Sequence, residues 1–137
     1  MRTVFIDTNV ILDVLLQNEP FWPDSIRIFQ LAELGEIRAY VSASSMTDIF
    51  YVAKKKLTIP LAREAMRKLL NLFQVVGVDS ADLLGALELP ISDMEDALQA
   101  WCAKKAGVDT LITRDTHGFP GLDIPTIAPA NFKMRTC

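Results

Sequence analysis

Short apolar runs alternate with longer amphipathic segments along almost the whole chain. The short runs lack a clean alternation of apolar and polar residues, which is typical of strands buried on both faces of a parallel sheet. We expect such strands at residues 3–6, 37–41, 73–78, 110–113 and 126–128. The intervals have the apolar spacing of helices, which we expect at residues 9–16, 23–34, 44–56, 60–72, 80–87 and 92–106.

This order of elements predicts the fold class. Strands that alternate with helices form a parallel sheet covered on both faces, so we expect an α/β protein with three α/β/α layers. A length of 137 residues suits one domain, spanning residues 1–137, with a core of its own.

Composition narrows the class of protein. Half of the residues are hydrophobic and 23% are charged, which excludes a disordered chain. The net charge of −3 gives no global argument for nucleic-acid binding. Two cysteines, Cys102 and Cys137, have no metal-ligand partners in sequence. No apolar run approaches the ~20 residues of a membrane span, so we expect a cytoplasmic protein without membrane contact.

Two strands of the predicted sheet end in an aspartate. The first apolar run ends at Asp7 and the run at residues 110–113 leads into Asp115. In open α/β folds, ligands bind outside the carboxyl ends of the strands. The sequence therefore predicts one acidic site built from both ends of the chain.

The helix expected at residues 92–106 adds a third acid, Asp96. Ser92 and Glu95 have the spacing of a capping box, so Glu95 is expected to cap the helix. The stripe expected to face the core comprises Met94, Ala97, Leu98 and Trp101. Asp96 lies on a neighbouring face with Asp93 and several small residues, which allow a close approach. We therefore interpret Asp96 as a site residue.

A fourth acid, Asp48, lies one turn inside a helix that opens with hydroxyl residues. A site residue and a solvated helix acid are equally good interpretations of it. Asp13, Asp24 and Asp79 are expected at the surface or at helix caps. His117, the one histidine, has no charge partner in view and carries little weight.

Clustered carboxylates imply a cation, because they repel one another unless one neutralises them. Ligand sets made only of oxygen select hard divalent ions, so we expect Mg²⁺ or Mn²⁺, as one ion or two. Such ions activate water and stabilise an in-line displacement at phosphorus. Four residues are expected to orient the acids or to cap turns: Thr8, Asn9, Asp93 and Thr113.

These residues together resemble the PIN-domain family of metal-dependent nucleases over nearly the whole chain. The matching motifs, in order, are Asp7-Thr8-Asn9, a serine-rich helix start with Asp48, the stretch 93–100 with Asp96, and Thr113-Arg114-Asp115 followed by Phe119. The chain departs from the family at two positions. The second acid is more usually Glu than Asp48, and the last motif often has Asp where this chain has Gly118.

The resemblance implies a PIN-like fold and a metal-dependent endoribonuclease. It implies cleavage of single-stranded RNA by metal-activated water, leaving a 3′-hydroxyl and a 5′-phosphate. The implied catalytic residues are Asp7, Asp48, Asp96 and Asp115, and of these Asp7, Asp96 and Asp115 are the implied metal ligands. It further implies a toxin restrained by a small antitoxin protein, and a homodimer or higher oligomer.

RNA would need cations near the acids. We expect Arg114 beside the site and Lys54 and Lys55 in the densest basic region to contact RNA, although a solvated helix end explains the two lysines equally well. A non-catalytic PIN-like module that binds RNA or protein stays open as an alternative. A phosphatase or receiver-type phosphate site is a weaker interpretation, because a phosphatase of that kind requires a second Asp where this chain has Asn9.

Overall fold

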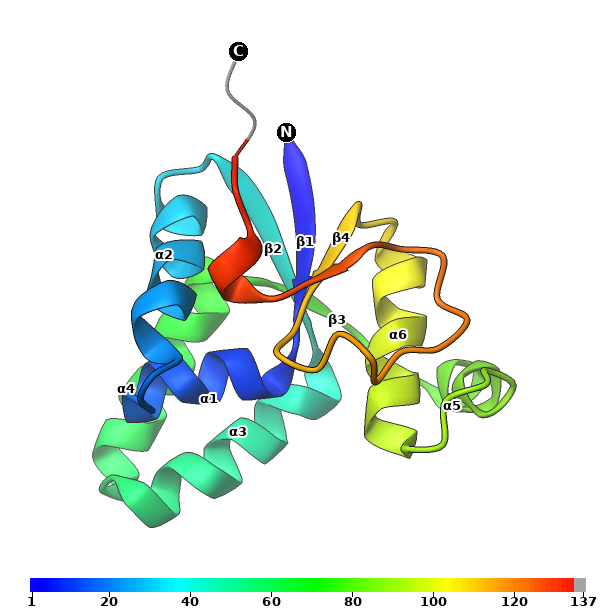
Figure 1. Cartoon of the computed structure of the whole chain (residues 1–137). Helices are drawn as coiled ribbons and strands as arrows, with labels where there is room; N and C mark the ends of the chain where they lie inside the picture. Colours follow the sequence, from blue (N-terminus) through cyan, green and yellow to red (C-terminus); the bar gives the residue numbers. More distant parts are fainter. Residues whose placement is uncertain (135–137) are drawn as a thin grey trace.

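Five parallel strands form the centre of the molecule, in the order β3-β2-β1-β4-β5 (Figure 1). This computed structural model describes residues 1–134. The strands are β1 (Arg2–Ile6), β2 (Ile37–Ser42), β3 (Gln74–Val76), β4 (Thr110–Ile112) and β5 (Thr126–Ile127). In the middle, β1 pairs with β2 on one side and with β4 on the other, where Ile6 lies beside Ile112. The carboxyl ends of β1 and β4 therefore meet.

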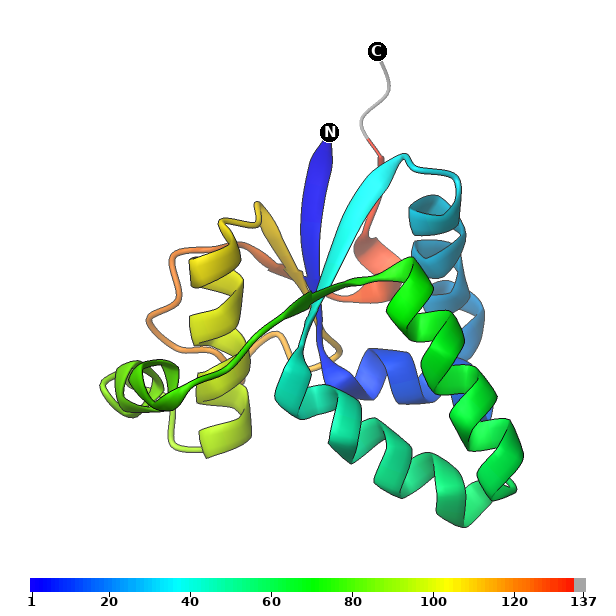
Figure 2. The ribbon, with the colours of Figure 1, turned by 180° about the vertical axis from the view of Figure 1, so that it is seen from behind.

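Helices cover both faces of the sheet, as the two views show (Figures 1 and 2). They are α1 (Thr8–Leu16), α2 (Trp22–Glu33), α3 (Ala43–Lys56), α4 (Ile59–Leu72), α5 (Ser80–Leu87) and α6 (Met94–Ala106), followed by a 3₁₀ turn, η1 (Pro129–Asn131). Val4 and Ile6 point into a core shared with α1 to α4. Phe5, between them, points into a second core with α5 and α6. The predicted three-layer α/β/α fold is confirmed.

Nothing among these helices, over residues 1–134, combines the length and the apolar character that crossing a membrane requires.

Helix α6 differs from its predicted start and its predicted buried face. The N-cap is Asp93, whose carboxylate accepts from the Asp96 N–H at 2.9 Å, so the capping box of Ser92 and Glu95 is wrong. The predicted core position of Met94 is wrong too, since that side chain is 38% exposed. Ala97 and Leu98 are buried as predicted, and the helix also buries the small side chains of Ala100, Cys102 and Ala103. Because these are small, α6 packs closely against the sheet.

Candidate active site

Asp7 is held by three parts of the fold at once. It ends β1, caps the N-terminus of α1 and is 4% exposed. Its Oδ2 accepts a hydrogen bond from the Thr113 hydroxyl at 2.7 Å, just after β4. Its Oδ1 accepts from Gln99 Nε2 at 3.2 Å, on α6, and from the Asn9 N–H at 3.4 Å. The carboxylate therefore has one fixed orientation at the carboxyl edge of the sheet.

Gln99 is the site residue that the sequence analysis missed. Its side chain is 1% exposed, and its Oε1 accepts from the Thr8 N–H at 3.1 Å while its Nε2 donates to Asp7. The oxygen and the nitrogen of this one amide thus each make a hydrogen bond to the turn between β1 and α1. Gln99 follows Asp96 by three residues, so the two share a side of α6. That spacing is the signal that would have pointed to it.

Asp96, in the first turn of α6, lies within the electrostatic reach of the other acids. Burial is the largest cause that raises the pKa of its carboxyl, to about 6. Four neighbouring carboxylates add to the effect: Asp93, Asp7, Glu95 and Asp115. Asp7 and Asp115 therefore lie within electrostatic range of Asp96. Figure 1 shows the starts of α1 and α6 and the loop after β4 at the same end of the sheet.

Glu95 faces the same region, although the sequence suggested a capping role. Burial is the largest cause that raises the pKa of its carboxyl, followed by the charge of Asp48. A hydrogen bond from the Thr8 hydroxyl opposes this rise. Asp48 itself is exposed on α3. The second acid of the predicted set is therefore exposed but lies within electrostatic range of Glu95.

Asp115 lies in the loop after β4, packed against a glycine. Its backbone N–H donates to the Thr113 hydroxyl at 3.0 Å, so Thr113 positions both strand-end acids. A Cβ at position 118 would lie 2.6 Å from Asp115 Oδ2. Gly118 thus leaves the space that this carboxylate occupies, and an Asp at that position would collide with it.

The donor set suits a hard divalent cation. All of the converging groups are carboxylate oxygens, as Mg²⁺ and Mn²⁺ prefer. Within residues 1–134, no three side chains of His, Cys, Asp or Glu stand close enough together to hold a metal ion. Neighbouring carboxylates raise the pKa of Asp96 and Glu95 because like charges repel, and a cation bound among them would offset that repulsion.

Arg114 is engaged by a buried acid. Its Nε donates to Asp13 Oδ2 at 2.7 Å and its Nη2 to Oδ1 at 3.4 Å, while the guanidinium lies 4.1 Å from the centre of the Phe21 ring. Asp13 is 1% exposed, so its predicted surface position is wrong. A buried carboxylate requires such a partner. RNA contact by Arg114 stays a prediction that depends on its remaining N–H groups.

The other predicted residues that the structure describes make no hydrogen bond or ion pair with Asp7, Asp96 or Asp115. Lys54 and Lys55 stand in the last turn of α3. Asp79 caps α5, as predicted, and His117 is exposed in a turn. Cys102 is buried, whereas Cys137 lies outside the described residues.

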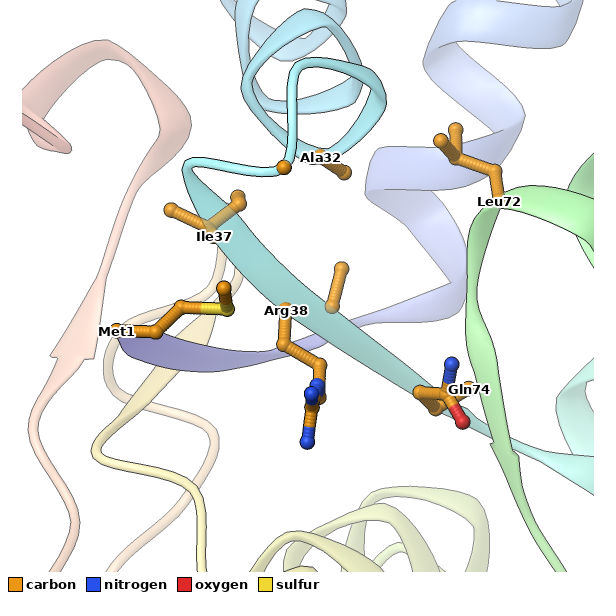
Figure 3. Close-up of a pocket in the computed structure, with 8 residues that line it drawn as sticks. Met1, Ala32, Ile37, Arg38, Leu72 and Gln74 are labelled. Carbon is orange, nitrogen blue, oxygen red and sulfur yellow. The ribbon is translucent and has the colours of Figure 1, made fainter.

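A hollow of about 220 Å³ lies at the opposite edge of the sheet (Figure 3). Its lining residues are Met1, Ala32, Gly35, Ile37, Arg38, Ala39, Leu72 and Gln74. They cluster where β2 begins, whereas Asp7 and Asp115 follow the ends of β1 and β4. This hollow contains no acidic side chain and is separate from the acidic site.

Comparisons with known proteins agree with this geometry. The chain is 25% identical, over 96% of its length and 94% of the relative, to Ribonuclease VapC1 of Aquifex aeolicus. Its fold resembles that of VapBC from Salmonella typhimurium bound to DNA, with a TM-score of 0.71, 17% identity and coverage of 94% and 99% of the two chains. FitAB bound to a DNA fragment gives a TM-score of 0.73 at 21% identity, covering 97% and 99%.

A family model described as "PIN domain" matches residues 3–117, a span that contains every acid discussed above. The order of the strands, the acids at their ends and this match lead to one conclusion: the chain belongs to the PIN domain family.

Proposed function

We propose that this chain is an endoribonuclease that depends on Mg²⁺ or Mn²⁺ and cleaves single-stranded RNA. The observation that carries the proposal is the convergence of three aspartates from distant parts of the chain. The charges of Asp7 and Asp115 both raise the pKa of Asp96. The Aquifex aeolicus relative named as a ribonuclease supports the same activity.

Asp7, Asp96 and Asp115 would be the primary metal ligands, with Asp48 as the fourth catalytic acid. When bound, the ion or ions would neutralise the acids and activate a water for in-line attack at phosphorus. A bond forms between the water oxygen and phosphorus while the bond from phosphorus to O3′ breaks, which leaves a 3′-hydroxyl and a 5′-phosphate. Within the chain, Gln99 and Thr113 fix Asp7, so its lone pairs are aimed before substrate arrives.

We further propose that the activity is restrained in the cytoplasm by a small antitoxin protein. One protein with this fold, from Klebsiella pneumoniae, is described as part of a toxin–antitoxin complex. A homodimer or higher oligomer belongs to the same proposal. An antitoxin gives a cell that makes such a nuclease a means of keeping its own RNA intact.

The decisive experiment follows cleavage of a labelled single-stranded RNA at pH 8, where Asp96, with its pKa near 6, is ionised. Mn²⁺ should support cleavage by the wild type and EDTA should abolish it. Asp7→Asn and Asp96→Asn should each lower the rate by at least about a hundredfold, because each removes one charge from the metal site. Asp123→Asn, at an exposed acid elsewhere, is the matched control.

Metal binding has a readout that is independent of cleavage. Mn²⁺ should raise the Tm of the wild type, since a ligand of the folded state stabilises it, and should raise that of Asp7→Asn much less. Cleavage that persists in both variants and in EDTA would show that these acids are not the nuclease site.

The non-catalytic module remains the second candidate, favoured by the absence of three ligating side chains in contact within residues 1–134. A module of that kind binds RNA with the same affinity in EDTA and in Mn²⁺. It cuts nothing in either condition.

A further inference from the structure

The outer face of α3 carries an aromatic ring flanked by two cations. Tyr51 is 54% exposed. The Lys55 ammonium lies 4.1 Å from the centre of its ring and the Lys54 ammonium lies 5.3 Å from it. Both lysines are exposed as well. An aromatic ring at this range attracts ammonium groups, so Tyr51 holds two positive charges together on one surface.

This cluster is continuous with the acidic site along a single helix. Asp48, Tyr51 and Lys55 follow one another at intervals of three and four residues, which places them on the same face of α3. The opposite face is buried, with Ser45, Met46, Ile49 and Ala53 turned toward the core. At 1.5 Å per residue, Lys55 lies about 10 Å along the helix from Asp48. Figure 1 shows α3 leading away from the carboxyl edge of the sheet.

We propose that Tyr51, Lys54 and Lys55 bind the single-stranded RNA where it leaves the acidic site. The proposal rests on the proposed function, because RNA is the substrate there. An acidic site repels phosphates, so affinity for RNA has to come from cations beside it. Aromatic rings next to cations are the chemistry with which proteins bind single strands: phosphates contact the ammoniums and bases stack on rings.

In this arrangement Tyr51 is a positioning residue for the two lysines and a stacking surface for a base. Both roles use the ring and neither uses the hydroxyl. Tyr51→Phe therefore keeps the contacts of the ring with the lysines and with a base. Tyr51→Leu keeps a side chain of similar bulk but removes the ring and with it these contacts. Since Tyr51 is largely exposed, neither variant is expected to change Tm.

The test measures binding of a fluorescein-labelled oligo(U) of about 12 nucleotides by anisotropy, in EDTA and at several salt concentrations. Each phosphate contact on a single strand contributes about 0.7 to the slope of log affinity against log salt. Lys54→Gln with Lys55→Gln should therefore lower the slope by about 1.4. Tyr51→Leu should weaken binding by roughly two- to fivefold, and Tyr51→Phe should match the wild type.

Lys56→Gln is the matched control. It removes the same charge one residue further on, about 100° around the helix from Lys55. Its slope should stay within experimental error of the wild type. A Lys56→Gln variant that loses as much as Lys55→Gln would show a general charge effect and would overturn the proposal.

Cleavage kinetics separate this proposal from the proposed function. In Mn²⁺ the lysine variants should raise KM and leave kcat unchanged. If the wild type cuts RNA and the variants keep its KM and salt slope, the surface proposal is wrong and the nuclease stands. If the wild type does not cleave RNA but the lysine variants bind RNA more weakly than the wild type does, the nuclease proposal is wrong and the RNA-binding surface on α3 stands. Variants that lose only a protein partner would assign α3 to that partner and overturn the RNA contact.

Discussion

Gly118 shows how a single missing side chain shapes the acidic region. A Cβ at position 118 would lie 2.6 Å from Asp115 Oδ2, which is too close, so a methyl group fits there only if the carboxylate moves. Gly118 is therefore compatible with the present position of the Asp115 carboxylate, whereas an acid at position 118 would require that carboxylate to move.

Gly118→Ala should displace the Asp115 carboxylate without unfolding the protein. The atom in the way, Oδ2, is the free end of a side chain and can rotate aside. We expect an almost unchanged Tm, and a rate of RNA cleavage lower by roughly ten- to a hundredfold, because a misplaced ligand disturbs the reacting geometry. Thermal unfolding and cleavage in Mn²⁺ measure the two effects.

Gly77→Ala is the control, since a Cβ there meets nothing within 4 Å. A Gly118→Ala protein that cleaves at the wild-type rate would show that the position of Asp115 does not matter.

At the scale of elements, α6 is joined to the corner between β1 and α1 through one buried amide. Replacing Gln99 with Met keeps the volume but leaves the Thr8 N–H without its acceptor and removes one of the two hydrogen bonds to Asp7 Oδ1. Unsatisfied buried groups lower the stability by about 1–3 kcal/mol. Urea denaturation of Gln99→Met should show this loss, together with reduced cleavage as Asp7 is freed to turn.

Gln74→Met, at an exposed glutamine on β3, provides the comparison and should denature like the wild type. Equal stability of Gln99→Met and the wild type would contradict the role given to the amide.

Helix α5 is anchored to α6 by a carboxylate, Asp82. The ammonium of Lys105 donates to its Oδ2 at 2.9 Å and the indole N–H of Trp101 donates to its Oδ1 at 3.0 Å. Hydrogen bonding by Lys105 is the largest cause that holds the pKa of Asp82 well below its usual range, and the N–H of Asp79 and the indole add to it.

This pKa makes the stability depend on pH in a defined direction. Because the folded-state pKa lies below the unfolded value of about 3.9, the contribution is complete above that value and is lost as the pH falls through the folded pKa. Asp82→Asn should therefore have a lower Tm than the wild type at pH 7. The difference should shrink as the pH falls below 4.

Thermal unfolding followed by circular dichroism from pH 7 to pH 2.5 measures both curves. Glu88→Gln, at an exposed acid at the end of the same helix, is the control. Its Tm should change with pH in the same way as that of the wild type. A constant difference between Asp82→Asn and the wild type at every pH would rule out the ion pair as its cause.

At the scale of the whole molecule, the sequence was enough to place the elements and the main acids. Short apolar runs located all five strands, and helical spacing located the six helices to within about two residues. The rule that strand ends carry ligands placed Asp7 and Asp115 together, because it depends only on parallel pairing.

The missed features all depend on packing between distant segments. In the sequence, Gln99 looks like an ordinary polar helix residue, because nothing there indicates its hydrogen bonds to Asp7 and Thr8. Asp13 reads as solvated because its partner, Arg114, lies 101 residues away. Met94 is exposed and Glu95 faces the other acids, because the packing of α6 against the rest of the fold decides which of its side chains are buried. Periodicity in one helix carries no information about such contacts.

The pairing of β4 with β1 has a consequence during synthesis of the protein on the ribosome. Asp7 and the Thr113 hydroxyl that holds it are 106 residues apart, so a ribosome must translate most of the chain before the two can touch. A growing polypeptide that still lacks its later third has the first aspartate but no companion from β4. For a protein with the proposed activity, the messenger RNA is therefore not at risk from a nascent copy until Thr113 has been synthesised and β4 has paired with β1.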